Sequence, residues 1–79
     1  MMNVALNGPD DLSITGKIHH GGHVELYDTK GGYYYGSMEP DCTITFYGPN
    51  NSYFYGIVDP NGNVVIHGPR GLNLLGRIV

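Results

Sequence analysis

Positive charge is scarce in this sequence. Its 79 residues include four lysines and arginines against seven aspartates and glutamates, and the formal net charge at pH 7 is −3. A protein that binds nucleic acid needs a basic surface, because it must displace counterions from the phosphates. The sequence therefore predicts no nucleic-acid partner, and the same shortage of cations argues against a polybasic membrane patch.

Long apolar runs and paired cysteines are also missing. No stretch approaches the roughly 20 apolar residues of a membrane-spanning helix, so we expect no membrane span. The first residues, M-M-N-V-A-L-N-G-P, lack the basic region and apolar stretch of a signal peptide, so we expect a cytoplasmic protein. Cys42 is the single cysteine, which excludes an internal disulfide. Its acidic neighbours Glu39 and Asp41 would disfavour a reactive thiolate, and we interpret it as a turn residue.

Helical periodicity is absent too. Thirteen glycines and five prolines recur too often for a long helix, and strict alternation is the pattern that remains. Even positions are apolar, whereas odd positions are mostly polar or tyrosine. We expect the even side chains to line one face of a single sheet. They are Val4, Leu6, Leu12, Ile14, Ile18, Val24, Leu26, Tyr34, Met38, Ile44, Phe46, Phe54, Val58, Val64, Ile66, Leu72, Leu74 and Ile78.

The chain is an internal repeat that forms one domain. Four units align at a twenty-residue spacing, at 3–22, 23–42, 43–62 and 63–79. Each unit has a turn-like break in its middle, and another break separates it from the next unit. Proline holds the second place in five of the seven breaks, which suits the first central position of a type I turn. Gly, Asn or Asp holds the fourth place in six, where a three-residue hairpin loop needs a left-handed residue.

These loops predict an all-β fold of eight short antiparallel strands in up-and-down order. Three-residue loops keep all even positions on one face and fix the register. The expected cross-strand pairs include Tyr27 with Tyr33, Tyr47 with Tyr53, and Phe46 with Phe54. Strand glycines at 16, 36, 56 and 76 should let the sheet coil strongly.

A single sheet of this size leaves its apolar face uncovered. Either the eight strands close into a small barrel, or two open sheets pack face to face in an oligomer. The drift of the register between hairpins is the stagger that closure requires. The terminal strands lack the lysines and prolines that protect an edge, so their edges should be hidden in either case. Tyrosine-rich strands also need cover on their odd face, which favours the oligomer.

Tyrosine is the most frequent aromatic residue in the chain. Six of the seven fall on odd positions of the two central units and should form clusters opposite the core. They are Tyr27, Tyr33, Tyr35, Tyr47, Tyr53 and Tyr55. Tyrosine combines rigid apolar area with a hydroxyl, which suits a protein, a peptide or a sugar as ligand. The alternative is that the rings only cover backbone and strengthen the strands.

Histidines give a second candidate site. In H-H-G-G-H the register places His19 opposite His23. Two imidazoles on adjacent strands can bind Zn²⁺ or Ni²⁺, but a stable site needs three or four ligands, so His20 or Glu25 would have to join them. A solvated cluster of turn histidines is the alternative.

The sequence carries no catalytic constellation. Every carboxylate except that of Glu25 lies in or beside a turn, where it can cap backbone groups. None lies on the even face, where burial would adapt it to acid–base chemistry. No helix follows the glycines to form a phosphate site. We therefore predict that the protein is not an enzyme and uses no cofactor.

Each unit contains a short strand segment centred on glycine. The segments are I-T-G-K-I (14–18), Y-Y-G-S-M (34–38), F-Y-G-I-V (54–58) and L-L-G-R-I (74–78). They resemble the aromatic-x-Gly-x-apolar core of MORN repeats, although this unit is shorter and has no tryptophan. The segments Y-D-T-K-G-G-Y (27–33) and D-P-N-G-N (59–63) also resemble the YD/Rhs repeats of secreted bacterial toxins. Either resemblance implies a curled antiparallel sheet that serves as a scaffold or contact surface.

Together these observations predict a small non-catalytic β-repeat protein. Its expected role is contact with another protein or self-association as a homo-oligomer. The alternative is a module that binds a small apolar or carbohydrate ligand, either in a barrel lumen or on the tyrosine face.

Overall fold

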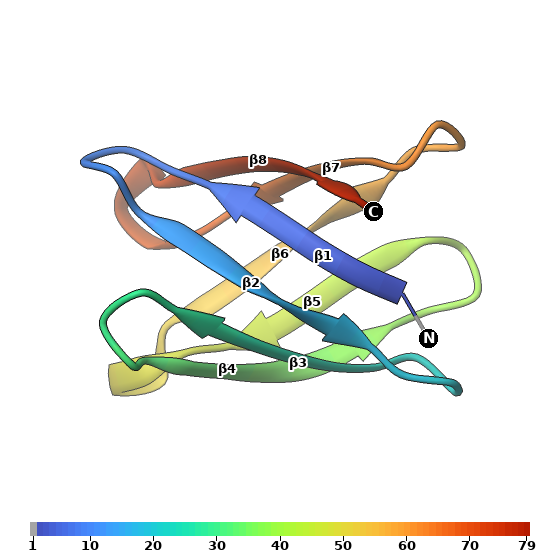
Figure 1. The fold of residues 1–79 in the computed structure, drawn as a ribbon, viewed down its shortest axis with the longest axis horizontal. Coiled ribbons are helices and arrows are strands. Elements are labelled where there is room, and N and C mark those ends of the chain that lie inside the picture. Colours follow the sequence, from blue (N-terminus) through green and yellow to red (C-terminus); the bar gives the residue numbers. More distant parts are fainter. Residues whose placement is uncertain (1) are drawn as a thin grey trace.

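The computed structural model describes residues 2–79, whose eight strands close into a small antiparallel barrel (Figure 1). Each strand pairs with the next along the chain, and the last pairs with the first. The strands are β1 (Met2–Asn7), β2 (Ser13–Ile18), β3 (His23–Asp28), β4 (Tyr33–Met38), β5 (Thr43–Tyr47), β6 (Tyr53–Val58), β7 (Asn63–His67) and β8 (Asn73–Ile78).

Closure decides between the two arrangements that the sequence left open. Strands β1 and β8 pair from Val4 opposite Ile78 to Asn7 opposite Leu75. The backbone groups at the two unprotected edges therefore pair with one another. The open sheet packed face to face, which the tyrosine content favoured, is not formed, because the curled sheet covers its own apolar face.

The core consists of the even-numbered side chains, as predicted. Thirteen of the eighteen are buried, and the other five, Leu12, Met38, Val58, Leu72 and Ile78, pack against them partly buried. Phe46 and Phe54 stack with ring centroids 4.9 Å apart, and Tyr34 meets both rings edge-on. These side chains occupy the interior, so the lumen is a packed core and not the ligand site that the sequence left open.

Four glycines let the strands cross closely enough for the barrel to close. Gly16, Gly36, Gly56 and Gly76 occupy the same place in each unit, on the inward face. At each one, an added Cβ would lie far inside 3.0 Å of a carbonyl oxygen on the neighbouring strand. Real Cβ atoms essentially never approach that closely, so only glycine fits.

All seven loops contain three residues, which confirms the predicted register. In each, the N–H of the residue before the loop donates to the carbonyl of the residue after it, as Asp28 does to Gly32 (3.0 Å). Tyr27 lies opposite Tyr33 and Phe46 opposite Phe54, as expected.

The turn type was predicted correctly in only part of the loops. In the three G-P loops the carbonyl of the proline itself accepts the turn hydrogen bond, as Pro49 does from the Ser52 N–H (3.2 Å). Proline is thus the first residue of the turn, and the two central residues both have left-handed φ, as in a type I′ turn. These central residues are Asp10 and Asp11, Asn50 and Asn51, and Arg70 and Gly71. The second and third of these G-P turns are short 3-10 turns, η1 (Pro49–Asn51) and η2 (Pro69–Gly71).

In two of the four other loops, a side chain at the start of the loop supports the earlier turn. Where the first residue is aspartate, its carboxylate holds the turn one residue earlier. Asp59 Oδ1 accepts the N–H groups of Asn61 and Asn63, both at 2.9 Å. Glycine at the start of each G-P loop has no such acceptor, and in these loops Asp, Asn, Arg and Gly hold the two left-handed central positions.

The loops lie at two ends of the barrel. Turns inside the units gather at one end, and turns between units gather at the other end with both termini (Figure 1). Residues 2–79 contain no helix that is long and apolar enough to cross a membrane.

Candidate functional site

The six odd-position tyrosines form one continuous row on the outside of the barrel, which we call the tyrosine ladder. Each ring is between 41% and 54% exposed. Adjacent ring centroids are 5.1–6.1 Å apart from Tyr27 to Tyr55, and His67 continues the row at 5.6 Å from Tyr55. The order is Tyr27, Tyr33, Tyr35, Tyr47, Tyr53, Tyr55 and His67. The structure thus brings together every tyrosine that the sequence singled out.

Register accounts for the spacing within the ladder. Asp28 and Gly32 form the hydrogen-bonded pair that closes the hairpin, and Tyr27 and Tyr33 are the next pair along the two strands. They therefore form a non-hydrogen-bonded pair, in which side chains approach more closely. Their centroids are 5.1 Å apart. Tyr35 and Tyr47 occupy a hydrogen-bonded position and are 6.1 Å apart. Because Tyr47, Tyr53 and Tyr55 repeat the first three positions at a spacing of twenty, the second half of the ladder copies the first.

Beside the ladder lies a shallow apolar groove of about 510 Å³ across β5, β6 and β7. Its lining includes Thr43, Thr45, Tyr55, Ile57, Val65 and His67. Ile57 is 55% exposed and lies opposite Val65, which in turn lies opposite the exposed Leu75. Sequence reasoning missed these three residues. The available signal was an apolar residue at an odd position, which parity places on the outside.

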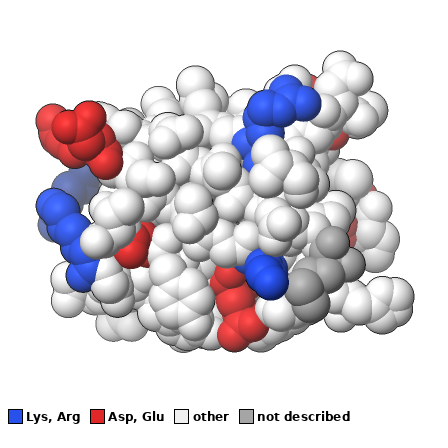
Figure 2. Space-filling view, in the orientation of Figure 1, with Lys and Arg blue, Asp and Glu red and all other residues white. Residues whose placement is uncertain are grey.

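The outward positions of β4 to β7 carry no Lys, Arg, Asp or Glu. They are Tyr33, Tyr35, Ser37, Thr43, Thr45, Tyr47, Tyr53, Tyr55, Ile57, Asn63, Val65 and His67. Figure 2, which views the molecule from the side of β1 and β2, shows charged side chains of both signs on that other face. The apolar groove and all of the ladder except Tyr27, which is on β3, therefore lie on the uncharged outward face of these four strands.

A second, polar cleft lies where this face meets the turns. It has a volume of about 560 Å³ and runs between the loops that follow β5 and β7. Its lining consists of Asn50, Asn51, Ser52, Tyr53, Tyr55, Gly68, Pro69 and Arg70. Tyr53 and Tyr55 line both hollows, so they separate an apolar groove from a polar cleft.

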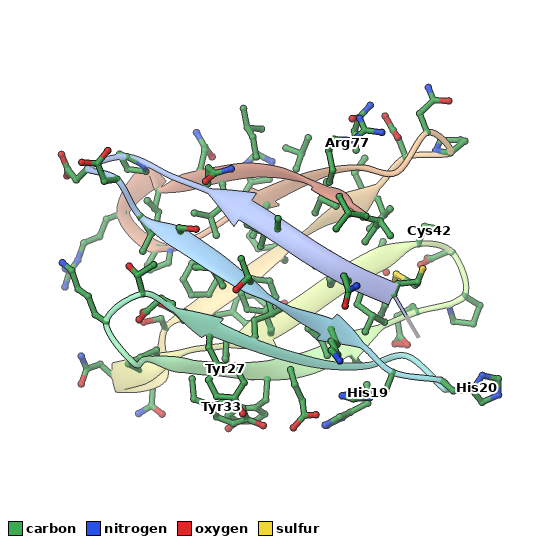
Figure 3. The ribbon with its side chains drawn as sticks, viewed as in Figure 1. His19, His20, Tyr27, Tyr33, Cys42 and Arg77 are labelled. Atoms are coloured by element: carbon green, nitrogen blue, oxygen red, sulfur yellow. The ribbon has the colours of Figure 1, made fainter. Side chains whose placement is uncertain are left out.

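A carboxylate lies at the β3 end of the ladder. The Tyr33 hydroxyl donates to Glu25 Oε2 (3.3 Å), and Glu25 Oε1 is 2.5 Å from His19 Nε2. Tyr27 and Tyr33 lie side by side on the outside of β3 and β4 (Figure 3). Loss of water contact and the charge of Glu25 raise the pKa of Tyr33. This end of the ladder therefore favours the neutral phenol.

The histidine cluster is only partly assembled. His19 and His23 face one another as predicted, with ring centroids 6.0 Å apart. Figure 3 shows His20 at the tip of the turn, projecting away from His19. Among residues 2–79, no group of three or more His, Cys, Asp or Glu side chains is arranged to bind a metal ion. Metal binding at His19 and His23 stays a prediction.

One carboxylate connects the core to a turn. Asp28 Oδ2 accepts the Tyr34 hydroxyl at 2.7 Å, while its Oδ1 accepts the N–H groups of Lys30 and Gly32, both at 2.8 Å. The hydrogen bond from Tyr34, followed by that from Gly32, lowers the pKa of Asp28. Burial, and then the hydrogen bond to Asp28, raises the pKa of Tyr34 to about 12. Asp28 therefore has a structural role, as the sequence predicted for turn carboxylates.

Comparisons with protein-family models, with curated proteins and with solved structures find no match to this chain. The resemblance to MORN and YD/Rhs repeats therefore stays a prediction, and a function has to be inferred from the geometry.

Proposed function

We propose that the protein is a non-catalytic contact module of the cytoplasm, whose tyrosine ladder binds a protein surface, that of another copy included. One observation carries the proposal: six half-exposed tyrosines form an unbroken row beside an apolar groove, and five of them lie on the uncharged outward face of β4 to β7. The core does not need these rings, because it is already filled by the even-position side chains.

The area of the ladder supports this proposal. An aromatic side chain contributes about 150–250 Å² when fully buried, so six half-exposed rings offer roughly 450–750 Å². The exposed Ile57 and Leu75 add to this area. A standard interface buries about 800 Å² per partner, and a single apolar patch of that size marks an interaction site.

The composition of the face supports it as well. Tyrosine is enriched at interfaces because it brings large area at a small cost in side-chain entropy, and the core of an interface is depleted of charge. A partner seated on β4 to β7 would leave no charged strand residue of this chain buried without a counterion.

The curvature of the ladder restricts the partner. The row crosses five strands of an eight-stranded barrel, from β3 to β7. A flat surface can touch only part of such a row. A partner that covers all of it must be concave, or must be a flexible segment that follows the barrel wall.

Site-specific photo-crosslinking in cells that produce the protein tests the proposal. A photoreactive phenylalanine analogue at Tyr47, in the middle of the ladder, should form a covalent adduct with a protein. The matched control is the same analogue at the exposed Asn3, on β1, which is four strands from β5 in either direction. An adduct of twice the chain mass indicates self-association, and another mass indicates a different partner. Equal adduct yields at both positions would contradict the proposal.

A further inference from the structure

The polar cleft between the two G-P loops has the lining of a binding site with a defined ligand chemistry. It combines two amides, a hydroxyl, two tyrosine rings and one guanidinium, and its lining contains no carboxylate. Its volume of about 560 Å³ is in the range of small-molecule sites. Donors and acceptors on Asn50, Asn51 and Ser52 lie beside the aromatic wall of Tyr53 and Tyr55.

Arg70 stands where the turn itself favours another residue. It has φ +57 at the third place of its loop, a left-handed conformation in which Asn, Asp and Gly are preferred. The same place in the equivalent loops is held by Asp10 and Asn50, with φ of +57 and +60. Residues that break a local rule in this way concentrate at functional sites.

The side chain of Arg70 also stays unused by the fold. Arg77, the other arginine, donates from its guanidinium to Asn63 Oδ1 and to the Asn61 carbonyl. No hydrogen bond or ion pair to the guanidinium of Arg70 is formed within the described residues 2–79. A strained turn therefore presents an uncompensated cation to a polar cleft.

We propose that this cleft binds an acidic sugar, a hexuronate unit of an oligosaccharide. The guanidinium of Arg70 pairs with the carboxylate, for which its planar fork of donors is suited. The apolar face of the sugar ring stacks on Tyr53 or Tyr55, and the amides of Asn50 and Asn51 take the ring hydroxyls. Both loops are held by type I′ turns, so the backbone that carries Asn50, Asn51 and Arg70 is in place before the sugar arrives.

This site shares Tyr53 and Tyr55 with the ladder, but it also requires residues that the proposed protein contact does not use. These are Arg70, Asn50 and Asn51, which lie in turns and outside the uncharged strand face. The site also needs only one copy of the chain. Sugar binding can therefore fail while the photo-crosslinking succeeds, and the reverse also holds.

The test follows backbone amide signals by NMR during titration with three ligands. These are a galacturonic acid trisaccharide, the neutral galactose trisaccharide and sodium acetate. We expect the acidic trisaccharide to shift the amide signals of Asn50, Asn51 and Arg70, and to bind at least tenfold more tightly than either of the others. Acetate that binds as tightly as the acidic trisaccharide would show an anion site only and would overturn the assignment to a sugar.

Two arginine variants make the test specific. Arg70→Asn keeps a residue that the left-handed turn favours but removes the guanidinium, and should weaken binding of the acidic trisaccharide at least tenfold. Arg77→Gln removes an equal charge at the opposite end of the barrel and should leave binding unchanged. Equal affinities of wild type and Arg70→Asn, or no amide shifts up to millimolar ligand, would overturn the proposal.

Discussion

The strand glycines lead to a strong prediction about stability, and Gly76 tests it at the seam that closes the barrel. Gly76 lies on β8 opposite Leu6 of β1. A Cβ added there would lie 2.8 Å from both the Ala5 carbonyl carbon and the Leu6 Cα, and closer still to the Ala5 oxygen. All three atoms belong to the backbone, so no side chain can rotate to make room.

The cost of Gly76→Ala follows from this contact. Strands β1 and β8 would have to separate by about 1 Å to bring the Cβ out to 3.0 Å. Overpacking costs about 1–3 kcal/mol, and each backbone hydrogen bond lost from the seam adds about 0.5–1.5 kcal/mol. We expect a loss of about 3–5 kcal/mol. A chain of this length has roughly 4–12 kcal/mol in total, so the substitution removes a large share of it.

Urea and thermal unfolding, followed by circular dichroism at one fixed protein concentration, measure this loss. At 4–8 °C for each kcal/mol, the melting temperature should fall by at least about 12 °C. Gly31→Ala is the matched control. Gly31 has φ +86 but no atom within 4 Å of an added Cβ, so it should lose only the roughly 1–2 kcal/mol of a left-handed alanine.

The steric explanation is decided by comparing Gly76→Ala with the control Gly31→Ala. Gly36→Ala, the equivalent change inside the sheet, should cost as much as Gly76→Ala, because its Cβ also meets backbone of the next strand. If Gly76→Ala lowers the free energy of unfolding by no more than Gly31→Ala, the close crossing of strands is not what requires glycine. The steric explanation for the repeated glycine would then be wrong.

Three further predictions concern the turns and the buried tyrosine. The pKa of Tyr34, raised to about 12 from the usual 10, means that stability present below pH 10 is lost as the pH rises through 12, by up to about 3 kcal/mol. Tyr34→Phe should reduce this alkaline loss in urea unfolding to the part that comes from the raised pKa of Tyr33, and a loss as large as that of the wild type would refute the assignment. Hydrogen bonds from Asn63 lower the pKa of Asp59, so the stability that its carboxylate contributes is present above pH 4 and is lost as the pH falls further. Asp59→Asn should make the free energy of unfolding fall less steeply below pH 4, and an unchanged acid dependence would count against this prediction. Arg70→Asn should raise the free energy of unfolding by about 1 kcal/mol, whereas Lys30→Asn, at the same loop position without a positive φ, should not; equal effects would contradict the turn argument.

Local patterns predicted most of the fold. Alternation identified the core, and an odd loop length fixed the register, because a shift of one residue would turn every apolar side chain outward. The observed pairs Tyr27–Tyr33 and Phe46–Phe54 follow from these two patterns alone. Both are local in sequence, and this is why a single chain was sufficient to predict them.

Closure could not be predicted in the same way. The pairing of β1 with β8 joins residues from the two ends of the chain, such as Val4 and Ile78, and no local pattern distinguishes it from pairing with another copy. The three G-P loops show a smaller failure. Proline suggested a type I turn, but with glycine at the first place no side chain holds that turn, and Asn50 and Asn51 adopt the left-handed pair instead.

The candidate sites show where the limit of the sequence lies. The ladder was predicted because six residues of one type share one parity. The groove was missed because its lining comes from β5, β6 and β7, and Thr43, Ile57 and Val65 become neighbours only in the sheet. The polar cleft was missed because it depends on the conformation of two loops that lie twenty residues apart. A sequence pattern therefore predicts a site built from one residue type at one parity, and only the assembled barrel reveals a site built from different residue types on several strands or loops.

Closure of the barrel buries the apolar core and leaves the six tyrosines of the ladder exposed. Close crossing at the strand glycines curls the sheet until its apolar face is covered, and each inward position on a strand is matched by an outward neighbour. Curling separates the outward side chains at their tips, so the six rings cannot bury one another and remain about half exposed. A flat sheet would have needed a partner for its core, whereas the closed barrel covers its own core and leaves an aromatic surface exposed. Gly76→Ala and the crosslinker at Tyr47 thus test two consequences of one geometry: the first opens the seam, and the second asks what the curved face touches.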